Sequence, residues 1–295
     1  MSWRVVVIAN RAKLDFQLGY MVVRGESVNK VFLNEMSTLI VEHTSVSFTA
    51  ALMAELVKNK IKVIFCDEKR NPLAELLPYY GAFDTSSKIR QQISWDDNIK
   101  GVVWAEIVRN KIKNQADVLK MFGKDGYELL TGYIADLKFN DESNREGHAA
   151  KVYFNTLFGK GFSRADDNNI NAALNYGYAM ILSACNREIT ANGYITQLGI
   201  HHSNVFNMFN LGSDMMEPFR AFVDIKVYDL WQNGELESFD RTQKLEIVDV
   251  LNRNVRFDEK TYSLNYAMKL YCKDVFDSLN EKDISRFSFC TFRDE

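Results

Sequence analysis

Short apolar runs separated by polar and turn-forming residues make up the first part of the chain. Short apolar runs between residues 4 and 42 read RVVVIA, KLDFQL, YMVVRG, NKVFL and STLIVEH. In the second run, Leu14, Phe16 and Leu18 alternate with polar neighbours, as in a strand with one buried face. Short strands separated by turns predict a small sheet or sandwich at the N-terminus.

A helix and another strand are expected next. In SVSFTAALMAELVKNK, Phe48, Leu52 and Leu56 recur at helical spacing, and KVIFCD reads as a buried strand. Residues 68–87 then contain two of the three prolines of the chain, a glycine and a Thr-Ser-Ser cluster, so they are the best candidate for a linker. We therefore predict an N-terminal β domain over residues 1–85 and a second domain over 86–295.

After this boundary the apolar period becomes helical. In NIKGVVWAEIVRNKIKNQADVLKMFG, Val103, Ile107 and Ile112 line an apolar side. The positive charges of the segment are Lys100, Arg109, Lys111 and Lys113. A charge run of this kind is usually a solvated helix face, and contact with DNA is the alternative. Further helices are predicted up to the alternating, strand-like FSFCTF near the C-terminus. The predicted fold class is α+β, with a small β-sandwich-like domain before a larger all-α domain.

Composition limits the class of protein. With 295 residues, of which 46% are hydrophobic and 13% aromatic, the chain can bury a sizeable core and is not expected to be disordered. A net charge of -3 argues against an indiscriminate nucleic-acid binder, although a local basic patch or a bound metal can reverse the sign at a site. No apolar run approaches the roughly 20 residues of a membrane helix, and VVVIA is too brief for a signal peptide.

The four cysteines do not suggest a metal site or a disulfide framework. They are widely spaced, at Cys66, Cys185, Cys272 and Cys290, and form no CxxC pair. We expect reduced thiols.

The side chains with the clearest chemical potential lie between residues 199 and 224. Adjacent His201 and His202 are followed by Asp214 and Glu217, which are one helical turn apart. Imidazole and carboxylate are the usual ligands of a divalent metal in phosphate or hydrolytic chemistry. Upstream, Glu146 begins a helix-like segment. Three ligands from three segments would leave coordination positions open, as a catalytic metal site requires.

Each of these residues also has a structural interpretation. Glu146 can be a first-turn carboxylate that faces the helix dipole, in a helix capped by Asn144. Asp214 and Glu217 can form a capping pair, although Pro218 disfavours helical geometry at Glu217.

Three cationic residues are candidates for phosphate contact. Arg220 lies one turn after Glu217, and an ion pair with Asp224 is its alternative role. Lys160 and Arg164 flank glycines in a loop, which is a weak signal for a phosphate-binding loop.

Several motifs together resemble a known family. Glu146 in EGHAAKVYF, His202 at the end of GIHH and Glu217 in DMMEPFR look like the metal-binding motifs of the CRISPR-associated adaptation endonuclease/integrase family. DDNNINAALNYGYAM and WAEIVRNKIKNQA resemble two further motifs of that family. The resemblance covers most of the chain. Within it, the subtype that accompanies a single-protein effector nuclease (type II) is the most similar.

The resemblance implies an activity and a set of site residues. The family inserts spacer DNA into CRISPR arrays in antiviral defence. Glu146, His202 and Glu217 would be the catalytic residues and would hold Mg²⁺ or Mn²⁺. Asp214 would be an additional ligand or a hydrogen-bond partner of one, and His201 would be a neighbouring, DNA-facing or packed residue.

The resemblance also implies partners. The family acts as a homodimer, and two dimers bridge a dimer of a small companion CRISPR-associated protein in a hetero-hexamer that binds spacer and repeat DNA. The N-terminal β domain would help form the dimer, and the protein would be cytoplasmic. Two other functions stay open at this point: a DNA-binding scaffold with a non-catalytic metal site, and a general metal-dependent nuclease of repair or recombination.

Overall fold

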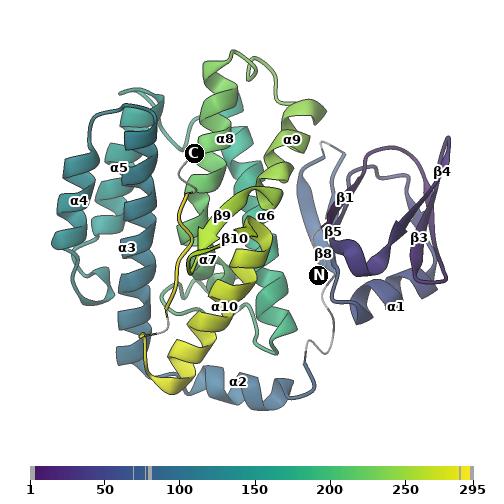
Figure 1. Ribbon diagram of the computed structural model, residues 1–295, viewed down its shortest axis with the longest axis horizontal. Coiled ribbons are helices and arrows are strands. Elements are labelled where there is room, and N and C mark those ends of the chain that lie inside the picture. The colour runs from purple at the N-terminus through teal and green to yellow at the C-terminus, as the bar shows by residue number, and fades with distance from the viewer. Residues whose placement is uncertain (1–3, 69, 77, 79–81, 286, 293–295) are drawn as a thin grey trace. The chain divides into compact units, whose positions relative to one another are not determined.

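The computed structural model describes residues 4–292 apart from 69, 77, 79–81 and 286. The chain forms two compact units (Figure 1): one consists of Met1–Thr85 and Thr190–Tyr194, the other of Ser86–Ile189 and Ile195–Glu295. Strands dominate the first unit and helices the second, so the predicted α+β class is confirmed. The dimerisation role of the N-terminal part stays a prediction.

Two four-stranded sheets build the first unit. Their orders are β1-β5-β7-β8 and β4-β3-β2-β6. The strands are β1 (Arg4–Ile8), β2 (Lys13–Gln17), β3 (Tyr20–Arg24), β4 (Val28–Phe32), β5 (Met36–Val41), β6 (Ser47–Phe48), β7 (Lys62–Cys66) and β8 (Pro72–Leu76). A short 3-10 turn, η1 (Leu33–Glu35), links β4 to β5. Each apolar run between residues 4 and 42, and KVIFCD after it, therefore contains a strand.

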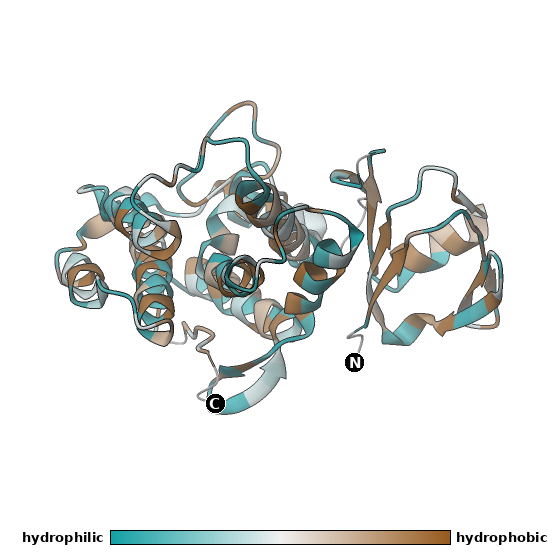
Figure 2. Ribbon diagram, turned by 90° about the horizontal axis from the view of Figure 1, so that it is seen from above, coloured by the Kyte–Doolittle hydropathy of each residue, from teal (hydrophilic) through white to brown (hydrophobic). Residues whose placement is uncertain are grey.

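Both sheets and one helix share a single apolar core. Leu14 from β2, Leu39 from β5 and Leu56 from α1 (Ala50–Lys58) all belong to it and are inaccessible to solvent. Figure 2 colours much of these strands and of this helix as hydrophobic. The hydroxyl of Thr49 accepts a hydrogen bond from the Leu52 amide at 3.3 Å and so caps α1. Burial of this shared core is what stabilises the sheets as a pair.

The linker prediction needs a correction. Within residues 68–87, Pro72–Leu76 form β8, which pairs antiparallel with β7 at the edge of the first sheet. The edge position accepts Pro72 because proline has no amide to donate. Gly81, which supported the linker, lies outside the described residues.

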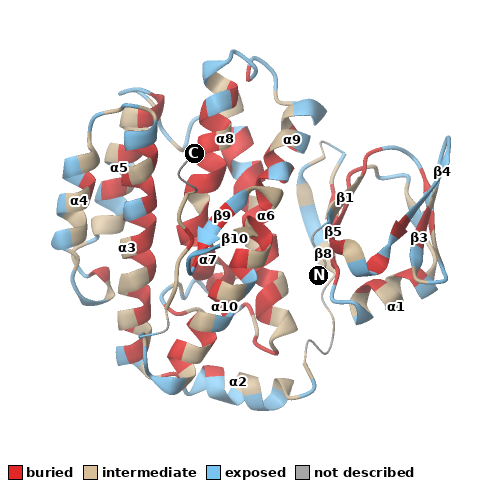
Figure 3. Cartoon of the chain, viewed as in Figure 1, coloured by how far each residue is buried: buried red, intermediate tan, exposed pale blue. Residues whose placement is uncertain are grey.

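Helices make up most of the second unit. They are α2 (Thr85–Ile93), α3 (Asp97–Met121), α4 (Tyr127–Ala135), α5 (Arg145–Phe158), α6 (Asn169–Ala191), α7 (Asn210–Met216), α8 (Arg220–Gln232), α9 (Arg241–Val248) and α10 (Leu264–Glu281). Short 3-10 turns are η2 (Phe139–Asp141), η3 (Glu217–Phe219) and η4 (Asp249–Asn252). Figure 3 shows α3 buried along much of its length, and it contacts α4, α5, α8 and α10. This central helix carries side chains to the interior of the unit.

The prediction of an all-α second domain is wrong in one detail. β9 (Asn254–Phe257) and β10 (Lys260–Ser263) form an antiparallel hairpin. Its turn residues, Asp258 and Glu259, both have positive φ, as a two-residue turn of type I′ requires. Asp-Glu is an unusual pair for such a turn, so the hairpin has no clear signal in the sequence. The strand-like FSFCTF contributes only a single bridge, between Thr291 and Arg256, within the described residues.

No helix in the described part of the chain is long and apolar enough to cross a membrane.

Candidate active site

Two acids and a lysine form the centre of the candidate site. Lys111 of α3 donates a hydrogen bond to Oε1 of Glu146 at 2.6 Å and another to Oε2 of Glu217. Glu146 belongs to α5, and Glu217 begins the turn between α7 and α8. The side chains of Lys111 and Glu217 are 11% and 4% exposed, so this ion pair is largely shielded from water. Two of the three predicted ligands thus converge on one cation.

Glu146 is held at the start of its helix. Asn144 caps α5 by accepting a hydrogen bond from the Gly147 amide at 3.3 Å, as the sequence predicts. The carboxylate of Asp141 accepts the Arg145 and Glu146 amides at 2.7 and 2.9 Å. Glu146 therefore lies in the first turn of α5, where its carboxylate can interact with the helix dipole. The same carboxylate also contacts Lys111.

Glu217 occupies a break between two helices. α7 ends at Met216, and Pro218 follows Glu217 in a 3-10 turn before α8 begins. Asn114 of α3 donates to the Pro218 carbonyl at 2.7 Å and fixes this break against the central helix. The alternative capping pair is wrong, because Asp214 lies in the last turn of α7, and Glu217 bonds to Lys111 and Arg220 instead.

Opposing effects act on the pKa of Glu217. Burial raises it, but the charges of Arg220 and then Lys111 outweigh burial and lower the pKa to about 2. Glu217 is therefore ionised at neutral pH.

Asp214 organises the histidine loop. Its carboxylate is fully buried and accepts the amides of Ile200, His201 and His202 at 2.6, 3.0 and 3.1 Å. A Cβ on Gly199 would lie 2.3 Å from the His202 carbonyl oxygen and 2.7 Å from Asp214, so only glycine fits this turn. The GIHH motif and the Asp214 carboxylate thus form one structural unit.

The two histidines have different environments. Nδ1 of the His202 ring lies 2.5 Å from Oδ1 of Asp214, and in the tautomer that carries the proton on Nδ1 the ring donates to this carboxylate. That hydrogen bond raises the pKa of His202 against the effect of burial, and the charges of Glu217 and Glu146 add to it. His201 instead stacks on the buried Trp104, with ring centroids 4.4 Å apart, and contacts Asn140 at 3.1 Å.

Arg220 pairs with Glu217 and not with Asp224. Its guanidinium lies 2.9 Å from Oε1 of Glu217 and 4.6 Å from the ring centre of Tyr178. Asp224 accepts hydrogen bonds from the hydroxyls of Tyr153, at 3.0 Å, and Tyr178. These contacts anchor Glu217 to the interior of the helical unit.

Asp224 is expected to make stability depend on pH. Burial raises the pKa of Asp224 to about 6, against a reference value of 3.8. Its contribution to stability is therefore complete below pH 3.8 and is lost as pH rises through 6. From pH 5 to 7 we expect the unfolding free energy of the native chain to fall by about 1 kcal/mol relative to Asp224→Asn.

Urea unfolding at the two pH values measures this difference. The exposed Asp125→Asn variant is the control and should follow the native chain. Equal pH dependence in all three proteins would contradict the assignment.

A hollow opens beside the histidine loop. It has a volume of about 650 Å³, and its lining includes Gln92, Lys100, His201 and His202. Gln92 of α2 binds the loop through the carbonyls of Ile195 and Leu198, both at 2.8 Å. The ring of His202 is therefore open to this hollow and is not enclosed in the core.

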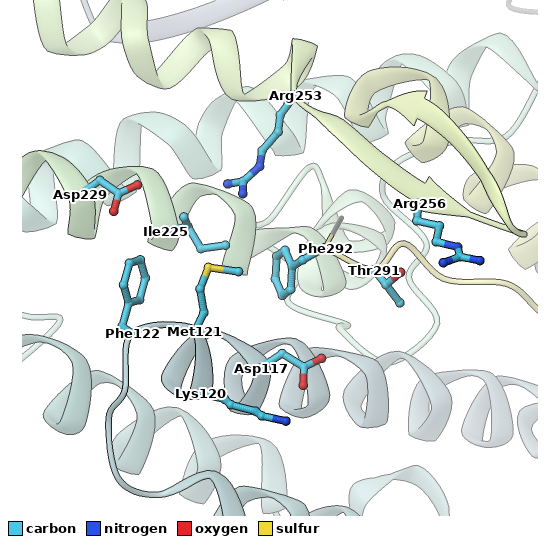
Figure 4. Close-up of a pocket in the computed structure, with 10 residues that line it drawn as sticks. All are labelled: Asp117, Lys120, Met121, Phe122, Ile225, Asp229, Arg253, Arg256, Thr291 and Phe292. Atoms are coloured by element: carbon cyan, nitrogen blue, oxygen red, sulfur yellow. The ribbon is translucent and has the colours of Figure 1, made fainter. Parts of the chain in front are cut away.

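A second cavity contains none of the predicted site residues (Figure 4). Its volume is about 940 Å³, and it lies among α3, α8, the start of β9 and the C-terminal segment. The lining residues are Asp117, Lys120, Met121, Phe122, Ile225, Asp229, Arg253, Arg256, Thr291 and Phe292. Both acidic and basic side chains line this cavity, and neither Glu146 nor Glu217 is among them.

The two cations of the predicted phosphate-binding loop have different environments. Lys160 is exposed after α5. Arg164 folds back onto α6, where it bonds to Asn171 and, at 2.5 Å, to Asn175. Arg164 therefore has a structural role here, and the DNA-binding roles of both residues stay predictions.

The site residues suit a hard divalent ion by their chemistry. Glu146, His202 and Glu217 offer the oxygen and imidazole donors that Mg²⁺ or Mn²⁺ accepts, and the two acids already share one cation. His202 lies close enough to both acids for their charges to raise its pKa. No group of three or more His, Cys, Asp or Glu side chains among the described residues is arranged to hold a metal. The ligand roles therefore stay predictions.

Sequence reasoning missed Lys111. The charge run on α3 was expected to be solvated or to contact DNA, whereas Lys111 is buried and faces two acids. Its position contained the signal: Val103, Ile107 and Lys111 are spaced four residues apart, so Lys111 lies on the buried stripe. A lysine on such a stripe needs carboxylate partners.

Comparison with known proteins identifies the family. The family model described as CRISPR associated protein Cas1 matches residues 5–257. A CRISPR-associated endonuclease Cas1 from Neisseria meningitidis serogroup C (strain 8013) is 35% identical over 241 residues, which cover 81% of this chain and 79% of that protein.

Solved structures share the fold. A casposase bound to integration product has a TM-score of 0.77 at 19% identity, with 96% of this chain and 92% of that chain covered. A chain of a Cas6-RT-Cas1–Cas2 complex has a TM-score of 0.74 at 16% identity. The match covers 96% of this chain and 36% of that chain. From the family match over most of its length, this chain belongs to the CRISPR-associated Cas1 family.

Proposed function

We propose that this chain is a metal-dependent DNA endonuclease and integrase that inserts spacer DNA into a CRISPR array. The observation that carries the proposal is the convergence of Glu146 and Glu217 on one cation, with His202 electrostatically coupled to both. Membership of a family with a curated relative named as an endonuclease supports it, as does a shared fold with a casposase bound to integration product.

Glu146, His202 and Glu217 would hold Mg²⁺ or Mn²⁺. Such an ion, when bound, lowers the pKa of an attacking hydroxyl and offsets charge on phosphate oxygens. Asp214 keeps the His202 ring in the tautomer that leaves Nε2 free as a ligand, a role typical of carboxylates behind metal-binding histidines. Arg220 holds Glu217 in place and keeps it ionised.

The reaction exchanges one phosphodiester for another. The 3′-OH of the incoming DNA attacks a phosphodiester at the edge of a CRISPR repeat, a new phosphodiester forms, and the repeat strand leaves with its own 3′-OH. No covalent intermediate with the protein is needed. With water as the nucleophile, the same site cleaves DNA as an endonuclease.

Partners are part of the proposal. A net charge of -3 gives the chain little general attraction to DNA, so a companion surface would help to hold it. The Cas6-RT-Cas1–Cas2 complex supports a Cas2-like companion, and we propose two homodimers bridging a companion dimer in the cytoplasm. Within the family, we assign the chain to the subtype that accompanies a single-protein effector nuclease (type II).

The test is a joining assay in vitro. The full chain, its small companion and a short duplex with free 3′-OH ends are mixed with a plasmid carrying a repeat array, with Mg²⁺, Mn²⁺ or EDTA. We expect joining at the repeat edges only when a divalent ion is present. Joining without preference for the repeat would favour a general nuclease of repair or recombination, and DNA binding without joining would favour a scaffold.

A further inference from the structure

Lys111 has no part in the proposed reaction, yet it lies at the centre of the site. Its ammonium bonds to Glu146 and Glu217, the two acids that would hold the metal. A lysine ammonium that donates to two carboxylates is positively charged at neutral pH. Lys111 therefore places a full positive charge where the two acids meet.

The charges around this point are already balanced. Glu217 contacts two cations, Lys111 through Oε2 and Arg220 through Oε1. Glu146 contacts Lys111. Adding a divalent ion to the same carboxylates would set three cationic centres around two acids, which like-charge repulsion in a poorly solvated site opposes.

We infer that Lys111 is an exchangeable cation, which holds the acidic pair together without metal and must leave it when a divalent ion binds. This inference rests on the proposed function, because it assumes that Glu146 and Glu217 are metal ligands. Lys111 acts through the two acids, so it is a positioning residue.

The chemistry of lysine suits such an exchange. An ammonium is a compact charge on a flexible four-carbon stem, and it can withdraw by rotating about its side-chain bonds. Arg220 is different, because its planar guanidinium binds the other oxygen of Glu217 through both Nε and Nη2 and packs on Tyr178. One cation of the site is therefore fixed, and the other is able to exchange.

The first experiment measures Mn²⁺ affinity of the metal-free full chain by titration with electron paramagnetic resonance of the free ion. Lys111→Met removes the competing charge and keeps an apolar stem. We expect it to bind Mn²⁺ about tenfold more tightly than the native chain. Lys113→Met is the matched control, since it removes the same charge from an exposed position on α3 and should bind like the native chain.

The second experiment uses the native chain and does not depend on how a variant folds. A lysine-acylating reagent is applied with and without Mn²⁺, and labelling is quantified by mass spectrometry. We expect labelling of Lys111 to rise severalfold with Mn²⁺, while that of Lys113 stays constant. In Glu146→Gln the Mn²⁺ dependence should disappear.

The outcomes separate this inference from the proposed function. Tight Mn²⁺ binding by the native chain, with equal or weaker binding by Lys111→Met or unchanged labelling, overturns the exchange and leaves the metal site intact. Failure of the native chain and both variants to bind Mn²⁺ overturns the exchange and the proposed metal site together. Mn²⁺ binding by Lys111→Met, with none by the native chain or Lys113→Met, would support the exchange and would mean that Lys111 fully blocks the metal site.

Discussion

His202→Ala is expected to reduce DNA joining by roughly 10³-fold or more while DNA binding persists. The variant removes an imidazole that lies close to both acids and leaves Asp214 with its three backbone donors. The His202 side chain is 40% exposed, so its truncation should cost little stability. Joining is measured by gel electrophoresis of labelled duplex, and binding by fluorescence anisotropy.

An exposed histidine in the same chain provides the control. His148 lies on α5, two residues after Glu146, and His148→Ala should join DNA at the native rate. Equal joining by the native chain and His202→Ala would exclude His202 from the chemistry. A scaffold would show no joining with any of the three proteins, although each would bind DNA.

Asp214→Ala is expected to destabilise the fold by about 3–5 kcal/mol. The substitution leaves three amides and the His202 ring without their buried acceptor, and each unpaired buried donor costs free energy. Urea unfolding followed by circular dichroism measures the loss. Ser213→Ala, on the same helix, is the control, because within the described part of the chain the Ser213 hydroxyl accepts one side-chain hydrogen bond, from Asn207.

Asp214→Ala should also impair the site in molecules that remain folded. Without Asp214 the His202 ring is free to rotate and to change tautomer, so Mn²⁺ affinity should fall by roughly 10- to 100-fold. A variant as stable as Ser213→Ala would mean that the histidine loop is held by other contacts. Gln92, which binds the loop through two carbonyls, would then be the residue to test.

Local patterns were sufficient for most of the fold. Short apolar runs in the first 42 residues predicted the strands, and one of them, over Leu14 to Leu18, alternates because a half-buried strand repeats every two residues. Asn144 predicted the start of α5 because its side chain caps the helix through local contacts alone. The errors arose where local signals were weak: β8 begins at a proline, and the β9–β10 turn uses Asp258 and Glu259 in place of the usual Asn-Gly.

Motif spacing selected Glu146, His202, Asp214 and Glu217 as candidates. The structure brings Glu146 and Glu217 to Lys111 of α3, and His202, which contacts Asp214, to Trp104 of the same helix. Their individual roles were not decided by spacing. Asp214 was open between ligand, capping residue and partner of a ligand, and the structure shows that it binds the His202 ring and three amides.

The strands, the main helices, the family and the candidate residues follow from the sequence, because they depend on short-range periodicity and on motifs with a fixed spacing. The contacts between distant residues follow only from the packed fold. Lys111 meets Glu146 and Glu217 across 35 and 106 residues of chain, and Arg220 binds Glu217 instead of Asp224. Such pairings depend on how α3, α5 and the α7–α8 break pack together, and no local pattern encodes that packing.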